Sequence, residues 1–194
     1  MNFKPIYWYY GNTKFSIQEI NEFKSKIDKI GDEKYTIDKE CISTFVYHKD
    51  DRPDVKYNDM YSEIVENITK NVGIYNNVLY NYTYWTQMYE KNMCHKPHNH
   101  AKLHPNFVDT ISWVHFIDVP EQKCFRFLDN DGNFFVPDEQ TNGDIICFPS
   151  WAWHEVLPNE TEHRRLVISG NISVTHFDTR KTVTIPCTES FFVL

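Results

Sequence analysis

The spacing of apolar residues divides the chain into two parts that meet near Gly73. Before this residue, apolar side chains recur at helical spacing in two segments, and after it that period disappears. The later part contains short apolar or alternating runs, separated by turn-forming residues such as those at 129–132 and 158–159. The pattern therefore predicts two helices followed by many strands.

The first predicted helix begins at the sequence Ser16-Ile17-Gln18-Glu19, which matches a capping box, and ends at Gly31. Its single apolar stripe consists of Ile17, Ile20, Phe23 and Ile27. The second helix begins near Asn58 or Asp59 and ends at Gly73, because glycine suits the left-handed cap of a helix. Its apolar face consists of Tyr61, Ile64, Val65 and Ile68.

Two strands are predicted outside these helices in the first part of the chain. Residues 1–10 form an opening strand, and Pro5 indicates an edge position because proline cannot donate to a strand ladder. Residues 41–47 form a short apolar strand. The charged, turn-rich loop 48–54 follows it, and we expect this loop to be solvated and to carry no chemistry.

The second part opens with a long alternating strand at residues 78–89, which places Tyr80, Tyr82 and Tyr84 on one face. Further strands are predicted at Thr110–Asp118, Lys123–Leu128, Gly143–Phe148, Glu155–Leu157, Arg165–Thr175, Thr182–Ile185 and Phe191–Leu194.

This order of elements favours a mainly β fold, a jelly-roll or cupin-like barrel with the helices packed outside one of its two sheets. At 194 residues the chain suits a single domain, with helical support over about residues 1–77 and a barrel core over about 78–194. Such a barrel has an open mouth in which a small ligand binds.

Composition narrows the range of partners. Aromatic residues make up 16% of the chain, which suits pleated surfaces. The net charge of -7 and the dispersed basic residues argue against nucleic acid as a partner. No apolar run approaches the length of a membrane span or a secretory signal, so we expect a cytoplasmic protein with no membrane contact. The five cysteines lack Cys-x-x-Cys spacing and are expected to be buried, reduced thiols.

Five of the nine histidines fall in one run: His95, His98, His100, His104 and His115. His98 and His100 are two residues apart, so on a strand that begins near Lys96-Pro97 their imidazoles point the same way. Neutral imidazole is a common ligand of transition metals. This pair is therefore one half of a candidate metal site.

A second unit runs from Gly143 to His154 and consists of a turn glycine, an apolar strand, Pro149 at its end and then a single histidine. Eleven residues later Arg165 opens an alternating strand, and Arg165, Val167, Ser169 and Asn171 share one of its faces. An inward-facing guanidinium is costly unless an anion pairs with it, and a carboxylate does so bidentately.

These segments, together with Ile111–Asp118, resemble the 2-oxoglutarate/Fe(II)-dependent oxygenases, and among them a subgroup common in marine bacteriophages. The resemblance covers about residues 80–175, and its most specific part is Phe-Pro-Ser-Trp, His, Arg and Ile-Ser-Gly-Asn in that order. It implies a double-stranded β-helix in which a His-x-Asp/Glu…His triad holds Fe(II). It also implies that His154 is the distal iron ligand, and that Arg165 binds the far carboxylate of 2-oxoglutarate.

The chain departs from that family at His100, which stands where a carboxylate is usual; no His-x-Asp or His-x-Glu occurs within residues 94–109. We expect His98, His100 and His154 to bind the metal, and His104 or Asp109 remains an alternative to His100. His95 and His104 are otherwise expected at the rim of the site or behind its ligands. His115 is expected in the core, hydrogen-bonded to backbone.

Cosubstrate contacts are expected from Arg165, Asn171 and Tyr89, because a phenol donates to a carboxylate while its ring excludes water. The other aromatics of this region are expected mostly in the core, with one or two at the pocket: Tyr82, Tyr84, Trp85 and Trp113.

The resemblance implies a dioxygenase that uses Fe(II), 2-oxoglutarate and O2 to hydroxylate a substrate while 2-oxoglutarate becomes succinate. A protein or peptide side chain such as proline is the favoured substrate class by family analogy. Two alternatives stay open. A cupin-type three-histidine metalloenzyme without 2-oxoglutarate fits the histidines but not Arg165, and a non-catalytic binding barrel would show no dependence on metal.

Overall fold

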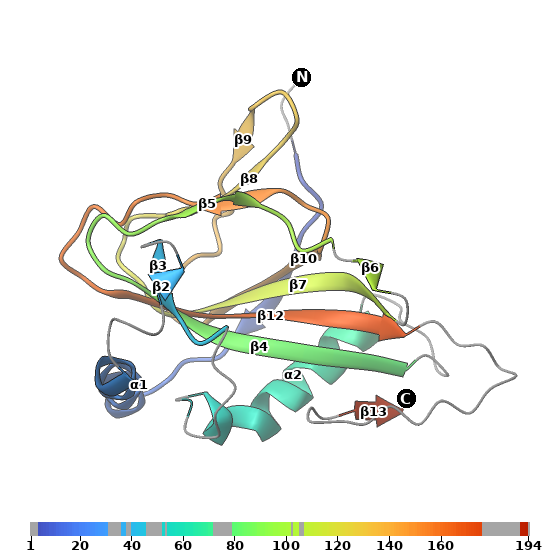
Figure 1. Cartoon of the computed structure of the whole chain (residues 1–194), viewed down its shortest axis with the longest axis horizontal. Helices are drawn as coiled ribbons and strands as arrows, with labels where there is room; N and C mark the ends of the chain where they lie inside the picture. Colours follow the sequence, from blue (N-terminus) through green and yellow to red (C-terminus); the bar gives the residue numbers. More distant parts are fainter. Residues whose placement is uncertain are drawn as a thin grey trace, which may run out of the picture.

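The protein folds into two facing antiparallel sheets, with two helices on the outer face of the larger sheet (Figure 1). The structure is a computed structural model that describes residues 4–30, 36–37, 40–45, 52, 54–71, 79–101, 103–104, 107–175 and 191–193. The predicted fold class, a barrel of two sheets with helices outside one of them, is confirmed.

The larger sheet has the order β1-β10-β7-β12-β4-β3-β2, with β6 paired to β7 and β13 paired to β4. Its strands are β1 (Trp8–Asn12), β2 (Thr36–Ile37), β3 (Cys41–Ser43), β4 (Leu79–Tyr89), β6 (Leu103–His104), β7 (Phe107–Asp118), β10 (Asp144–Pro149), β12 (Arg165–Thr175) and β13 (Phe191–Val193). The long strands β4, β7 and β12 form its centre.

The smaller sheet has the order β5-β11-β8-β9 and lies above the larger one in Figure 1. Its strands are β5 (His95–His98), β8 (Phe125–Leu128), β9 (Phe134–Phe135) and β11 (His154–Val156). The short strands β2, β6 and β9 were not predicted, because pairs of residues carry no periodic signal.

Both helices form as predicted, and their predicted apolar faces pack against the core except at Ile17. In α1 (Ile17–Ile30) the Ser16 amide donates to Glu19 Oε2 at 2.8 Å and the Glu19 amide donates to Ser16 Oγ at 3.3 Å, which confirms the capping box. A short 3-10 helix, η1 (Val55–Tyr57), leads into α2 (Asn58–Asn71), and the whole predicted apolar face of α2 is buried. The predicted helix ends at Gly31 and Gly73 lie outside the described residues.

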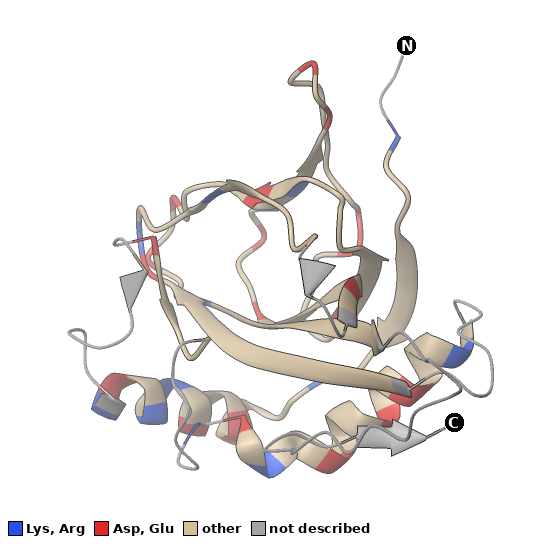
Figure 2. Ribbon diagram, turned by 45° about the vertical axis from the view of Figure 1, so that its right-hand side comes forward, with Lys and Arg blue, Asp and Glu red and all other residues tan. Residues whose placement is uncertain are grey.

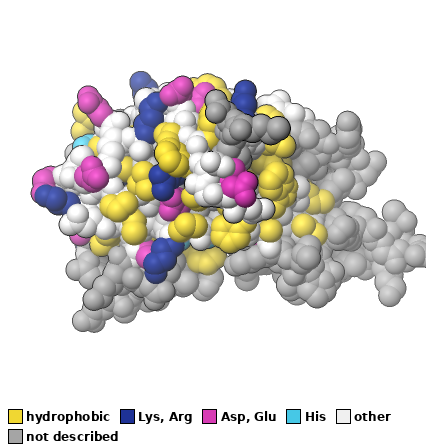
Figure 3. Space-filling view, turned by 90° about the horizontal axis from the view of Figure 1, so that it is seen from above, with side chains coloured by type: hydrophobic (Ala, Val, Ile, Leu, Met, Phe, Trp, Pro, Cys, Tyr) yellow, Lys and Arg dark blue, Asp and Glu magenta, His cyan; other side chains and the backbone are white. Residues whose placement is uncertain are grey.

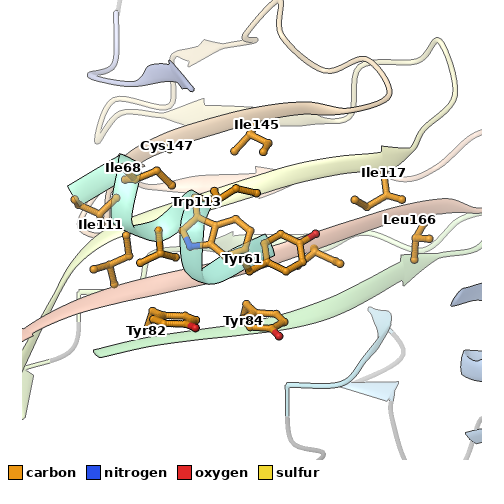
Figure 4. Packing of buried hydrophobic residues seen from close by; sticks show 14 of the residues in the cluster. Tyr61, Ile68, Tyr82, Tyr84, Ile111, Trp113, Ile117, Ile145, Cys147 and Leu166 are labelled. Carbon is orange, nitrogen blue, oxygen red and sulfur yellow. The ribbon is translucent and has the colours of Figure 1, made fainter. Parts of the chain in front are cut away.

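Strand alternation divides the buried residues into two clusters, one on each side of the larger sheet. Tyr82, Tyr84 and Trp113 face the helices and pack with Tyr61 and Ile68 of α2 (Figure 4). The cluster between the two sheets is lined by the opposite faces of the same strands, and it includes Tyr89, Val114, Phe116, Phe125, Phe127, Phe148 and Val167. A ligand pocket of the barrel is therefore expected mainly among the residues that point away from the helices.

Gly170 marks a close approach within the larger sheet. A Cβ at this position would lie 2.4 Å from the indole of Trp113 and 2.7 Å from the backbone oxygen of Thr83. A glycine is therefore needed in the middle of β12 so that the Trp113 ring can lie flat across the strand.

Charged residues lie mainly on the helices and connecting loops, and the long central strands carry them only near their ends (Figure 2). Seen from the side of the smaller sheet, the described surface mixes acidic, basic and apolar side chains (Figure 3). No helix within the described ranges is long and apolar enough to span a bilayer.

Several predictions of local structure need correction. The first strand is Trp8–Asn12, which begins after Pro5; its predicted edge position is confirmed. Ile17 is 78% exposed, because the first turn of α1 projects beyond the core that Phe23 and Ile27 enter. Cys94 is partly exposed, whereas the other described cysteines, Cys41, Cys124 and Cys147, are buried; all four are free thiols. The strand predicted at Thr182–Ile185 lies outside the described residues.

The loop predicted to be solvated contains a buried carboxylate, Asp54. Its Oδ2 accepts hydrogen bonds from Thr44 Oγ1 at 3.2 Å and Thr86 Oγ1 at 3.0 Å, and its Oδ1 lies 3.2 Å from Arg52 Nε. Burial raises the pKa of Asp54 above its ordinary value. The prediction was wrong at this residue because Asp54 anchors the segment before α2 to strand β4.

His115 lies in the core as predicted. Its Nε2 lies 2.7 Å from the Thr13 carbonyl oxygen and its Nδ1 lies 2.9 Å from the Tyr61 hydroxyl. The carbonyl only accepts, so Nε2 carries the proton, and Nδ1 accepts from Tyr61. Burial lowers the pKa of His115 from 6.5 to about 4.

This shift predicts acid sensitivity of the fold. Between pH 6.5 and about pH 4 the unfolded chain binds a proton at His115 that the folded chain does not. The free energy of unfolding is therefore highest near neutral pH and decreases as the pH falls through this range. In wild type this decrease in the free energy of unfolding totals about 3 kcal/mol, and the His115→Gln variant should not show it. Urea unfolding at several pH values measures it, and equal pH dependence of wild type and variant would contradict the assignment.

Candidate metal centre and adjoining pocket

Three histidines converge between the two sheets. His98 ends β5 and His154 begins β11, and these residues are direct partners in the antiparallel register. Their ring centroids are 4.3 Å apart, and the His100 ring lies 5.0 Å from His98 and 5.2 Å from His154. One ring nitrogen from each of the three lies within 4.8 Å of the others. The structure thus brings together the three residues predicted as ligands.

Backbone carbonyls fix the orientation of two of these imidazoles and the tautomer that their neutral rings adopt. His98 Nδ1 lies 2.7 Å from the Lys96 oxygen, and His154 Nδ1 lies 2.9 Å from the Ala152 oxygen. Because a carbonyl only accepts, Nδ1 donates in both residues and Nε2 keeps its lone pair. Burial lowers the pKa of His98 and holds that of His154 well below its ordinary value. A lowered pKa favours the neutral ring, which is the form that binds metal.

His100 reaches the cluster by a different route from the one predicted. Strand β5 runs from His95 to His98, so Pro97 lies inside the strand and His100 lies beyond it. The explanation by alternation along one strand was therefore wrong, although the prediction that the rings meet was right. The His100 amide donates to the Ser150 carbonyl at 2.8 Å, which turns this segment toward the site.

Asp109 and His104 are the alternatives to His100 as the third metal ligand. Asp109 lies on β7, its carboxylate accepts a hydrogen bond from Ser173 Oγ, and it is not part of the three-histidine group. The side chain of His104 lies outside the described residues. His95 lies behind His98: the two rings stack at 4.0 Å, and His95 Nε2 lies 3.7 Å from Glu40 Oε2.

A pocket with an empty volume of about 420 Å³, part of it open to solvent, adjoins the histidines. Its lining residues come from both sheets and are Trp85, Gln87, Tyr89, His95, His98, His100, Ser112, Trp113, Val114, Phe125, Phe148, His154, Val156, Arg165, Val167, Ser169 and Gly170. The predicted inward face of β12 contributes Arg165, Val167 and Ser169 to this lining.

Arg165 is the buried charge of the pocket. Its side chain is 2% exposed, its guanidinium carbon lies 5.5 Å from the Tyr89 ring and 5.8 Å from the Phe116 ring, and burial lowers its pKa. Its Nη1 atom has no hydrogen-bond partner among the described residues. By contrast, Arg164 points outward and pairs with Asp28 at 3.1 Å and with Glu90 at 3.5 Å. Arg165 is therefore the guanidinium available to an anion inside the barrel.

The remaining predicted contacts divide between the pocket and its surroundings. Tyr89, Trp85 and Trp113 line the pocket, and Trp113 also packs in the helix-side cluster with Tyr82 and Tyr84. Asn171 is buried but does not line the pocket, and its Oδ1 accepts a hydrogen bond from the pocket residue Ser112 at 2.8 Å. Its contact with a cosubstrate stays a prediction.

The donor groups fit a divalent transition metal and a carboxylate. Three imidazoles suit Fe(II), Zn(II) and similar ions. The partnerless Nη1 of Arg165 is a buried donor of the kind that a carboxylate satisfies. We therefore infer that the pocket fits a metal ion together with an anionic small molecule.

Sequence reasoning did not single out Gln87, Ser112 or Ser150. Gln87 Oε1 accepts a hydrogen bond from Ser169 Oγ at 2.8 Å, and Ser112 Oγ lies 3.1 Å from Ser150 Oγ. Strand alternation carries the signal for the first two, since Gln87 follows Trp85 and precedes Tyr89 on one face, and Ser112 shares a face with Val114. Alternation does not mark Ser150, which lies in a turn; its only signal is its place in the Phe-Pro-Ser-Trp motif.

Known structures share this architecture. No protein-family model and no curated protein matches the chain. A Pseudomonas putida prolyl-4-hydroxylase matches 86% of this chain and 91% of its own length, with a TM-score of 0.58 and 14% identity. The viral collagen prolyl hydroxylase of Paramecium Bursaria Chlorella virus-1, solved with 2-oxoglutarate, matches 86% and 94%, with a TM-score of 0.60 and 12% identity. This chain has the double-stranded β-helix fold of 2-oxoglutarate/Fe(II) oxygenases.

The same fold accommodates other chemistry on small molecules. The epimerase SnoN, solved in complex with Fe3+, α-ketoglutarate and nogalamycin RO, matches 86% of this chain and 78% of its own length, with a TM-score of 0.55 and 13% identity. The fold is therefore compatible with several reactions, and the reaction of this chain has to be argued from its own site.

Proposed function

We propose that this protein is an Fe(II)/2-oxoglutarate-dependent dioxygenase that hydroxylates its substrate. The observation that carries the proposal is the position of Arg165, which lines the same pocket as three converging histidines. Its guanidinium is buried, and its Nη1 has no hydrogen-bond partner among the described residues. Iron and 2-oxoglutarate together supply the activation of O2, by which 2-oxoglutarate becomes succinate and CO2 and a substrate C–H bond becomes C–OH.

The proposed roles of the residues follow from their chemistry. His98, His100 and His154 would hold the metal without contributing charge, so the anionic cosubstrate would supply the charge that a ligand carboxylate supplies elsewhere. Arg165 would bind the far carboxylate of 2-oxoglutarate bidentately. The rings of Tyr89, Phe125 and Phe148 would exclude water and strengthen that ion pair.

For the substrate we propose a protein or peptide side chain, with proline as the first candidate. The support is analogy, since the prolyl-4-hydroxylase and the collagen prolyl hydroxylase share the fold. The pocket is lined by aromatic side chains such as Trp85, which suits a small, weakly polar ring.

An anaerobic titration tests the proposal directly. Fe(II) is added to the metal-free protein and 2-oxoglutarate follows, and we expect the visible charge-transfer absorption of the chelate to develop with one equivalent of each. Its absence in wild type, with Fe(II) nevertheless bound, would favour the three-histidine metalloenzyme without 2-oxoglutarate. Absence of any Fe(II) binding would favour a barrel that only binds ligands.

A further inference from the structure

The structure raises the question of what positions His100, because this residue lies beyond strand β5. A ligand on a strand is held by backbone hydrogen bonds to the neighbouring strands, but His100 lies outside strand β5. The His100 amide donates a hydrogen bond to the Ser150 carbonyl at 2.8 Å. The location of Ser150 therefore affects where the His100 ring can lie.

The turn that contains Ser150 contacts a second proposed ligand as well. Its Ala152 carbonyl accepts from His154 Nδ1 at 2.9 Å, and the Ala152 amide donates to the Pro149 carbonyl at 2.9 Å. The turn at residues 149–153 thus supplies one carbonyl to His100 and another to His154. Any displacement of this turn would move two of the three imidazoles.

Ser150 is itself anchored to the larger sheet by buried polar groups. Its amide donates to the Thr110 carbonyl at 3.1 Å, and its Oγ lies 3.1 Å from Ser112 Oγ. Ser112 Oγ donates to Asn171 Oδ1 at 2.8 Å, so the Ser112 oxygen accepts the proton of Ser150. The side chains are 0%, 2% and 7% exposed for Ser150, Ser112 and Asn171. Water therefore competes little for these bonds.

We propose that the chain of side chains Asn171–Ser112–Ser150 positions the metal ligands by fixing the 149–153 turn, an inference that rests on the proposed metal site. In this proposal Asn171 acts through Ser112 and Ser150, a role that replaces the cosubstrate contact predicted from the sequence and agrees with its place outside the pocket lining. These residues are positioning residues: they take no part in the reaction, and they replace the strand ladder that His100 lacks.

The test compares two variants of the same shape at residue 112. Ser112→Thr keeps the hydroxyl and Ser112→Val replaces it by a methyl, and both add one methyl beside the pocket. Anaerobic titration with Co(II) alone reports affinity, and the visible absorption of bound Co(II) reports ligand geometry. We expect about tenfold weaker binding and an altered spectrum for Ser112→Val, and affinity within about twofold of wild type for Ser112→Thr.

A second pair of variants, at Ser150 and Ser173, keeps the inference testable if a variant at residue 112 does not fold. Ser150→Ala should weaken Co(II) binding in the same direction, whereas Ser173→Ala should leave it unchanged, since Ser173 is a buried serine on the same strand face as Asn171 but bonds Asp109. Thermal unfolding of each variant verifies folding. Equal Co(II) affinity and spectra in wild type, Ser112→Val and Ser150→Ala would overturn this inference alone. A wild type that binds no Co(II) would overturn the metal site itself.

Discussion

Replacing His154 by alanine is expected to lower the affinity for Fe(II) or Co(II) by more than about 100-fold. This loss exceeds the one expected when a residue that only hydrogen-bonds a metal ligand is replaced. His154 is buried, is held by the Ala152 carbonyl and faces both other imidazoles, so no other described side chain takes its place. Isothermal titration calorimetry of the metal-free protein measures the loss.

The surface histidine His163, which pairs with Asp118 at 3.0 Å, supplies the matched control, and His163→Ala should bind metal as wild type does. Extending the alanine series to His98, His100, His104 and Asp109 identifies the third ligand. We expect losses at His98 and His100 and none at Asp109, whose carboxylate bonds Ser173. Wild-type affinity in His100→Ala would exclude the proposed triad.

The second large effect is expected at Arg165. Arg165→Met should keep metal binding but weaken 2-oxoglutarate binding by about 30-fold or more, because losing one member of a buried charge pair costs about 2 to 5 kcal/mol. The measurement is the 2-oxoglutarate dependence of the anaerobic charge-transfer absorption. Arg164→Met is the control, since Arg164 pairs with Asp28 and Glu90 on the outside. Equal weakening by both variants would contradict the assignment.

Arg165→Met should weaken 2-oxoglutarate binding without lowering the stability of the ligand-free protein. Without an anion, wild type carries a buried guanidinium whose Nη1 has no partner in the described part of the chain. A methionine of similar length removes this cost and keeps much of the packing against Tyr89 and Phe116. Urea unfolding without 2-oxoglutarate should therefore find Arg165→Met at least as stable as wild type. A marked loss of stability would mean that Arg165 serves the fold rather than a ligand.

Much of the site was readable in the sequence because strand alternation is a local property. The strand Arg165–Thr175 was predicted with its observed bounds, and alternation along it turns Arg165 and Ser169 into the pocket. His154 was predicted from the proline that ends the preceding strand. Alternation also placed Tyr82 and Tyr84 on one face, although it does not say which face meets the helices.

His100 shows where local reasoning stopped. The spacing of His98 and His100 predicted two rings on one side of a strand, but the strand ends at His98. The rings still converge, because a turn some fifty positions later in the chain offers its Ser150 carbonyl to the His100 amide. The identity of Ser150 carries no sign of this role, since hydrogen bonds between distant segments depend on how the sheets pack.

The sequence by itself determined the order of the helices and the longer strands, the inward face of β12 and the residue types of the candidate site, because these depend on period and side-chain chemistry. Only the tertiary structure decided that His98, His100 and His154 meet and that Asn171 lies behind Ser112. The same holds for Arg165, whose Nη1 has no partner within the described ranges. These facts depend on the register between strands and on the packing of one sheet over the other, and neither is encoded in any single segment.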